Sequence, residues 1–302
     1  MFVQGNTFAN IFKKLRKLLL DAPIVISREQ ETRELLSFSF ELTNPRNRLI
    51  YHQQRKYNYA FNIAEMFSHI AGINSVQYMD FWNSNYKQFS DNGVNFLGNY
   101  GERLKFQIPN LINKLRRHPH TRQATLSIYN SNDIMRETKD VPCTIALDFK
   151  IRDNKLYLHT FMRSNDLIFG LQYDLVAFTL MQEIIANSIG VELGSYNHTA
   201  ASLHVYKKHW ELLKDMSNVK HIEMEKVTET YCDILSYANE ANRIAIDPDY
   251  YSNIKGHLMD SLYLHKLRKF GVLENIEIDY TQLSNYLVKI MKLKTNMRGS
   301  KP

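Results

Sequence analysis

The chain contains little cysteine, proline or glycine: of its 302 residues, two are cysteine, seven are proline and eleven are glycine. The two cysteines, Cys143 and Cys232, lie far apart in different contexts, which excludes a disulfide framework and leaves too few thiols for a cysteine zinc site. No apolar run reaches the roughly 18 residues that a membrane span requires, and the N-terminus lacks a signal-peptide pattern. We therefore expect a soluble, cytoplasmic protein without a metal site or a membrane partner.

Hydrophobic residues make up 44% of the sequence, which is enough for one large domain or for one domain with an extension. The formal net charge of +7 suggests an anionic partner, and nucleic acid is one candidate. The basic clusters at residues 13–17, 114–117 and 266–269, however, are interleaved with apolar residues at helical spacing. This pattern favours the solvated faces of amphipathic helices over a nucleic-acid site.

The spacing of apolar residues predicts a mixture of helices and strands. Two of the strands, over residues 144–149 and 156–161, flank a tight turn at Arg152-Asp153-Asn154-Lys155 and so predict a hairpin. After residue 210 the predicted elements are helical. The other predicted strands are 35–42, 124–129 and 194–206, and the predicted helices are 8–20, 60–70, 175–189, 227–241 and 251–270.

Polar side chains gather around this hairpin. Cys143 comes directly before the first strand, a cluster from Arg163 to Asp166 follows the second, and Asp174 precedes the next helix. Each has an ordinary interpretation on its own: a small buried cysteine, a turn cap at Asp166 and a helix N-cap at Asp174. Together they form the arrangement expected of a site built at the end of a sheet.

Four motifs stand out between residues 142 and 206. They are Pro142-Cys143, Arg163-Ser164-Asn165-Asp166 with Met162 before it, Phe169-Gly170, and SLHVY from Ser202 to Tyr206. In these motifs and in the spacing between them, the chain resembles the thymidylate synthase family over roughly residues 5 to 215. Within that family it is most similar to the phage deoxycytidylate hydroxymethylases.

The resemblance implies an α+β, thymidylate synthase-like fold: a large mixed β-sheet packed with helices, dimerising through the sheet. It implies a catalytic domain over residues 1–215 and a mainly helical C-terminal extension over residues 216–302 packed on it.

The resemblance implies chemical roles for several side chains. Cys143 is expected to add as a thiolate to C6 of a pyrimidine, which makes C5 nucleophilic, and Arg163 nearby favours the thiolate. Glu65, in a segment EMFSHIAG that is similar to the family's ELLWFxxG, is the expected acid, base and water-ordering group. Partly apolar surroundings favour a raised pKa for Glu65. Asp166 is the expected carboxylate toward the folate, and Tyr100 is expected near the nucleophile.

The resemblance also implies how the substrate and the cofactor bind. Arg28 is the favoured ligand of the nucleotide phosphate, with Arg33 as the alternative, and Arg122 is expected to reach the phosphate in the partner's site of a homodimer. Gln123 stands where the family has a second arginine, which weakens this grip by one charge. For Trp82 a core position is the alternative to a folate contact. The remaining expected contacts are Arg163, Ser164 and Asn165 toward the nucleotide, His204 and Tyr206 toward the 3′-hydroxyl, and Trp82, Asp166 and Gly170 toward the folate.

Asp174 bears on which base is bound. Thymidylate synthases have asparagine in the pattern PFN, whereas this chain has Gln172-Tyr173-Asp174. An asparagine amide can donate to O4 of uracil, but a carboxylate only accepts, and cytosine offers an amino donor at N4. We therefore predict a dCMP 5-hydroxymethyltransferase that takes a one-carbon unit from 5,10-methylenetetrahydrofolate, with water capturing the methylene intermediate.

Two alternatives stay open at this point. A pyrimidine nucleotide C5-methyltransferase, acting on dCMP or as a thymidylate synthase on dUMP, would transfer hydride and release dihydrofolate. A non-catalytic, basic nucleic-acid-binding protein would have no need of Cys143. The resemblance further suggests a virus that modifies its own cytosines, and hence the cytoplasm of a host cell.

Overall fold

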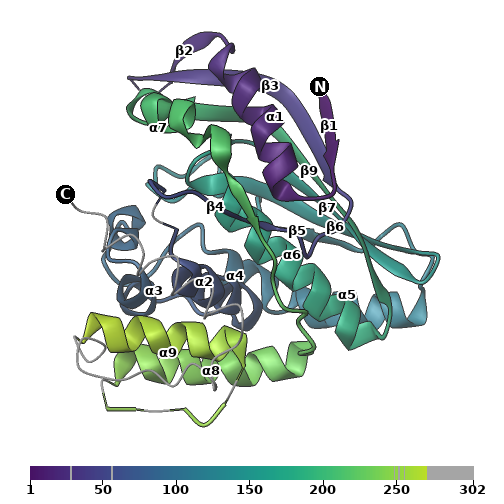
Figure 1. Cartoon of the computed structure of the whole chain (residues 1–302). Helices are drawn as coiled ribbons and strands as arrows, with labels where there is room; N and C mark the ends of the chain where they lie inside the picture. The colour runs from purple at the N-terminus through teal and green to yellow at the C-terminus, as the bar shows by residue number, and fades with distance from the viewer. Residues whose placement is uncertain (28, 56, 248, 251, 255, 271–302) are drawn as a thin grey trace.

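The computed structural model describes residues 1–270, apart from residues 28, 56, 248, 251 and 255. One mixed β-sheet lies at its centre (Figure 1), and among the described residues it has eight strands. The order is β1-β3-β9-β7-β6-β5, with β2 beside β3 and β8 beside β9. This confirms the predicted α+β fold with a large mixed sheet. The strands are β1 (Phe2–Gly5), β2 (Ile24–Ser27), β3 (Gln30–Leu42), β5 (Thr125–Ser127), β6 (Thr144–Arg152), β7 (Lys155–Met162), β8 (Asn165–Asp166) and β9 (Glu192–Tyr206).

The predicted hairpin is confirmed as β6 and β7, which pair in antiparallel register with Arg152 opposite Lys155. The two residues between them, Asp153 and Asn154, have φ angles of 49° and 58°. Two successive residues with positive φ form the tight turn whose twist matches that of paired strands, and aspartate and asparagine tolerate this conformation. The turn therefore fixes the register that aligns the ends of both strands.

Three helices cover the same side of the sheet (Figure 1): α1 (Phe8–Leu20), α5 (Gln107–Arg117) and α6 (Gly170–Ile189). Helix α1 begins and ends where the apolar spacing predicts. At its start the Thr7 side chain caps the helix by accepting a hydrogen bond from the N–H of Asn10. The side chains that point toward these helices, such as Phe40, Phe149 and Leu158, are fully buried. The core lies between the helices and this face.

Helix α6 begins at Gly170, about one turn before the predicted residue 175. Its start is held by the buried side chain of Arg55. This side chain donates to Gln172 Oε1 and to the carbonyl of Ile168 in the preceding loop (2.8 Å). Asp174 therefore lies inside the helix, and its interpretation as an N-cap is wrong. Its carboxyl is left for other contacts.

A second group of helices packs below the sheet in Figure 1. Helices α8 and α9 contact α2, with ring pairs such as Phe67 and Tyr237, whose centroids are 6.3 Å apart. The part of the predicted C-terminal extension beyond residue 270 lies outside the described residues, and the boundary at residue 215 stays a prediction. The remaining elements are α2 (Tyr59–Ala71), α3 (Val76–Trp82), α4 (Tyr100–Leu104), α7 (Trp210–Asp215), α8 (Tyr231–Ile246) and α9 (His257–Lys269), with a two-stranded sheet of β4 (Leu49–Tyr51) and β10 (Lys220–Ile222).

Within the described residues, no helix is long and apolar enough to span a membrane, and no three metal-ligating side chains come together.

A buried ion pair joins α6 to the segment before β4. Glu183 on α6 accepts from Arg48 and, at 2.6 Å, from Arg46. The side chains of Arg48 and Glu183 are 0% and 1% exposed, so neither charge is stabilised by water.

Removing one partner of this pair should be costly, because the other charge stays buried. We expect Arg48→Met to lower the free energy of unfolding by about 3–5 kcal/mol, toward the lower end because Arg46 still contacts Glu183. Lys214→Met is the matched control, since its ion pair with Glu211 is exposed and should contribute less than about 1 kcal/mol. Urea unfolding of both variants measures the difference; equal, small losses would contradict the account.

Candidate active site

The loop before β6 holds Cys143 against the residue that follows β7. The backbone N–H of Arg163 donates to the Cys143 carbonyl (2.8 Å), and its guanidinium donates to the carbonyls of Pro142 (2.8 Å) and Val141 (2.9 Å). The same guanidinium lies 3.6 Å from the half-buried Cys143 Sγ. A cation at this distance favours the thiolate, which is the nucleophilic form.

Tyr100, at the start of α4, positions the backbone of the cysteine. Its hydroxyl accepts from the N–H groups of Cys143 (3.2 Å) and Thr144 (3.0 Å). Its ring stacks on the imidazole of His69 from α2, with centroids 5.0 Å apart. Burial raises the pKa of Tyr100, so the hydroxyl stays protonated at neutral pH. Tyr100 thus joins α2 and α4 to the loop that contains Cys143.

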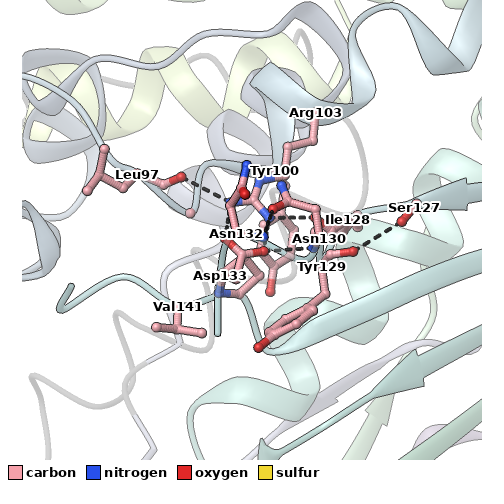
Figure 2. A network of polar contacts seen from close by, with 12 residues as sticks. Leu97, Tyr100, Arg103, Ser127, Ile128, Tyr129, Asn130, Asn132, Asp133 and Val141 are labelled. Atoms are coloured by element: carbon pink, nitrogen blue, oxygen red, sulfur yellow. Dashed lines mark hydrogen bonds and ion pairs between the residues drawn. The ribbon is translucent and has the colours of Figure 1, made fainter. Parts of the chain in front are cut away.

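Arg103 anchors the other end of α4, as Figure 2 shows. Its guanidinium donates to both carboxylate oxygens of Asp133 (2.5 and 2.7 Å), to the carbonyl of Ile128 (2.6 Å) and to that of Leu97 (3.1 Å). A planar guanidinium and a carboxylate in this two-pronged contact have a fixed geometry. The helix that supplies Tyr100 is therefore fixed to the segment after β5.

Two acidic side chains, Glu65 on α2 and Asp174 on α6, form the polar centre of the site. Burial raises the pKa of Glu65 to about 8; the charge of Asp174 adds to this, and a 3.3 Å hydrogen bond from the Tyr86 hydroxyl opposes it. Burial raises the pKa of Asp174 to about 7, opposed by a hydrogen bond of 2.6 Å from Asn165 Nδ2. Both carboxyls can therefore gain and lose a proton near neutral pH.

The short strand β8 brings the predicted sugar and folate residues together. Asp166 lies opposite His204 in the parallel pairing of β8 with β9. Burial raises the pKa of Asp166, and burial lowers that of His204. His204 Nδ1 is 3.4 Å from Ser164 Oγ, and its ring centroid is 5.0 Å from that of Tyr206. Polar side chains of β8 and of the end of β9 thus lie next to one another.

A family model described as thymidylate synthase matches residues 30–230, which is more than half of the chain. The chain belongs to the thymidylate synthase family. The resemblance in the motifs is thereby confirmed, as is the expected one-carbon donor, since the family uses methylenetetrahydrofolate. This thymidylate synthase family member is a folate-dependent transferase that attaches a one-carbon unit to C5 of a pyrimidine.

Relatives with curated names are similar over different lengths. The deoxyuridylate hydroxymethyltransferase of Bacillus phage SP01 is 32% identical over 284 residues, which cover 83% of this chain and 73% of that protein. The enzyme of the same name from Pseudomonas phage M6 is 30% identical over 194 residues. The match covers 62% of this chain and about half (54%) of that protein. The thymidylate synthase of Listeria monocytogenes serotype 4a (strain HCC23) is 29% identical over 116 residues, covering 38% of this chain and 37% of that protein.

Four further predicted site residues have different outcomes. Trp82 is 1% exposed and packs against Phe81 and His265, which favours the core alternative to a folate contact. Arg122 is exposed in the loop before β5, and Arg28 lies outside the described residues. Arg33, the alternative to Arg28, lies over the Trp210 ring at 4.9 Å and donates to the carbonyl of Ala22, just after α1 (2.9 Å). The roles assigned to these residues stay predictions.

Sequence reasoning missed three side chains that hold the site of this family member: Arg55, Tyr86 and Arg103. Arg55 lies in a polar segment with the composition of a surface turn, yet it is 6% exposed beneath the start of α6. Tyr86 comes from a short 3₁₀ helix, η1 (Tyr86–Phe89), whose sequence has no periodic signal. No local pattern indicates their partners, because each partner lies far away in the chain.

Glu65→Gln should change the pH dependence of stability. Folded Glu65 keeps its proton up to about pH 8, whereas in the unfolded chain the carboxyl ionises near its ordinary pKa of 4.5. Between these pH values folding takes up a proton, so the wild type loses up to about 1.4 kcal/mol of stability per pH unit through this residue. In urea unfolding measured across pH, we expect the two proteins to be equally stable near pH 4, the advantage of the variant to grow between about pH 4.5 and pH 8, and the difference to level off above about pH 8. A difference that does not vary with pH would contradict the assignment.

Proposed function

We propose that the protein is a dCMP 5-hydroxymethyltransferase, a homodimer that converts dCMP, methylenetetrahydrofolate and water into 5-hydroxymethyl-dCMP and tetrahydrofolate. The observation that supports the choice of base is the place of Asp174. Its carboxyl is inside the first turns of α6, beside Asn165 and Glu65, and does not cap the helix. A buried carboxyl that is free of a structural duty in its own helix is available to a ligand.

The carboxyl of Asp174 favours cytosine on grounds of hydrogen bonding. A carboxylate accepts from the N4 amine of cytosine, and in its protonated form it also donates to the unprotonated N3. Toward uracil, the ionised carboxylate meets the O4 acceptor and one of the two groups is left unpaired. A site that leaves buried polar groups unpaired discriminates against the wrong substrate by several orders of magnitude.

A second candidate is hydroxymethylation of dUMP. It is favoured by the names of the relatives from the Bacillus and Pseudomonas phages, both called deoxyuridylate hydroxymethyltransferases. The two candidates share the nucleophile, the cofactor and the capture by water. They differ in the exocyclic group at C4 of the base, which is the group that Asp174 would contact.

The chemistry follows from the positions of Cys143 and Glu65. Addition of the Cys143 thiolate to C6 of the pyrimidine makes C5 nucleophilic, and Arg163 and Tyr100 hold the sulfur in place for that addition. C5 would form the new bond to the one-carbon unit and lose its proton, and cleavage of the bond between that carbon and the folate nitrogen would free tetrahydrofolate and leave an exocyclic methylene on the base. Water adds to the resulting exocyclic methylene of the base, and elimination of Cys143 from C6 restores the ring. Glu65, whose pKa of about 8 keeps a proton at neutral pH, is the group that transfers protons and orders the water.

The residues present are consistent with a folate. Asp166 offers a carboxyl in a poorly solvated place, with Oδ1 accepting from the N–H of Ile168 (2.9 Å), and carboxylates accept from the N–H groups of a pterin. The ring of Phe169 is 45% exposed next to it. Gly170 adds no side chain there. When bound, methylenetetrahydrofolate supplies a one-carbon unit at the oxidation level of formaldehyde.

The face of the sheet opposite to the helices supports a homodimer. The side chains on it include Phe161 and Ile145, which are 36% and 40% exposed, and His159, which stacks on Phe161 with centroids 4.1 Å apart. Apolar side chains on an uncovered sheet face indicate a protein partner. A second copy of the chain on this face would bring the exposed Arg122 of one protomer toward the phosphate of the other.

Asp174→Asn should reverse the choice of base. We expect the wild type to use dCMP at least about 100-fold better than dUMP in kcat/KM, and the variant to prefer dUMP, because an amide donates to O4. Cys143→Ser should form no product from either. Mass spectrometry of the product and an assay for dihydrofolate complete the test. A methyl product with dihydrofolate would contradict capture by water, and turnover of dUMP alone by the wild type would contradict the role of Asp174.

Phe161→Asp should weaken the dimer, because it places a charge on an apolar interface. We expect the wild type to sediment as a dimer and the dissociation constant of the variant to rise at least about tenfold. Phe106→Asp is the matched control, since Phe106 is 72% exposed at the start of α5, on the helical side. A monomeric wild type at micromolar concentration, or equal effects of both variants, would contradict the proposed interface.

A further inference from the structure

Asn165 has an unusual combination of contacts. It is 3% exposed on β8, and its Nδ2 donates to Asp174 Oδ2 over 2.6 Å. Its own Oδ1 is buried and has no hydrogen-bond partner among the residues that the structure describes. A buried acceptor without a partner costs free energy, and proteins rarely retain one without a reason. The unpaired Oδ1 of Asn165, beside the carboxyl proposed to bind the base, points to a hydrogen-bond donor on the ligand.

The hydrogen bond between the two side chains fixes the orientation of both. The amide must turn Nδ2 toward the carboxyl, because Oδ1 would face another acceptor there. Oδ2 of Asp174 is then an acceptor in either protonation state, and a proton on Asp174 resides on Oδ1. The carboxyl therefore presents its donor and its acceptor in a fixed order.

This fixed order matters because a carboxyl that gains a proton near pH 7 is ambiguous by itself. A free carboxylic acid can exchange the positions of its O–H and C=O, and so pair with the N3–H and O4 of uracil as well as with the N3 and N4 amine of cytosine. Fixing Oδ2 as the acceptor removes one of the two arrangements. The neighbouring Oδ1 of Asn165 adds a second acceptor, and an exocyclic amine has two N–H groups to donate.

Gly170 leaves room for this pair. A Cβ at residue 170 would lie 3.3 Å from Asn165 Nδ2 and 3.7 Å from Asp174 Oδ2. The first distance is tighter than an ordinary contact, so a side chain here would push the Asn165 amide by a few tenths of an ångström. The absence of a side chain at residue 170 thus leaves the hydrogen-bonded pair undisturbed.

We propose that Asn165 is a specificity-determining residue, whose Nδ2 fixes the order of donor and acceptor on Asp174 and whose Oδ1 accepts the second N–H of a 4-amino pyrimidine. The proposal rests on the proposed function, in that it requires dCMP to be the preferred nucleotide. It extends that function by making the choice of base a property of two side chains from β8 and α6.

The test compares full-length wild type, Asn165→Leu, Asn165→Ser and Asn187→Leu, each with methylenetetrahydrofolate and with dCMP or dUMP. Leucine has nearly the shape of asparagine but neither its donor nor its acceptor. We expect kcat/KM for dCMP to fall about 10- to 100-fold in Asn165→Leu, and the ratio of dCMP to dUMP to fall at least tenfold. Asn165→Ser should lower the ratio in the same direction, and it covers the case in which the leucine variant does not fold.

Asn187→Leu is the matched control, because Asn187 is also an asparagine, lies on α6 with Asp174, and donates to the carbonyls of Val227 and Glu229 (3.0 Å each). Its ratio should equal that of the wild type even if its stability is lower. A wild type that prefers dCMP together with an unchanged ratio in both Asn165 variants would overturn this proposal alone. A wild type that does not prefer dCMP would overturn the proposed function and this proposal with it.

Discussion

The contact between Arg163 and the cysteine loop is the interaction on which the rest of the site depends. The Arg163 guanidinium donates to two carbonyls of that loop, and its Nη2 lies 3.6 Å from Cys143 Sγ. It therefore holds the sulfur in position and also favours the thiolate form. The position of Arg163 is set in turn by the hairpin of β6 and β7, whose tight turn fixes the strand register. The position of Cys143 thus follows from the geometry of the sheet.

Two acidic side chains of the site, Glu65 and Asp174, are buried away from water. Burial raises the pKa of Glu65 and of Asp174 into the neutral range, which gives two carboxyls that exchange protons under physiological conditions. Their neighbours differ: a tyrosine hydroxyl beside Glu65 and a primary amide beside Asp174. The two carboxyls thus have different hydrogen-bonding surroundings, which agrees with the proposed division between proton transfer at Glu65 and base recognition at Asp174.

The sequence predicted the parts whose cause is local. Helix 8–20 follows from its apolar spacing and its Thr7 cap, and the hairpin follows from Asp153 and Asn154. The residues of the motifs could be identified from a resemblance to a family. The contacts that join these residues could not be predicted from it. The predicted start of α6, residue 175, was wrong. The first turn of this helix is held by Arg55, which is 117 residues away from its partner Gln172, and not by a local N-cap side chain. Contacts of this kind depend on tertiary packing, which periodicity does not report.

The measurement that tests the account most directly is covalent trapping with 5-fluoro-dCMP. Fluorine at C5 does not leave as a proton does, so a pyrimidine to which the enzyme has added stays attached. Mass spectrometry of the denatured protein, after incubation with the analogue and methylenetetrahydrofolate, should show an adduct on the peptide that contains Cys143, and none in Cys143→Ser. An adduct on another residue, or an adduct of equal yield in the serine variant, would contradict the account.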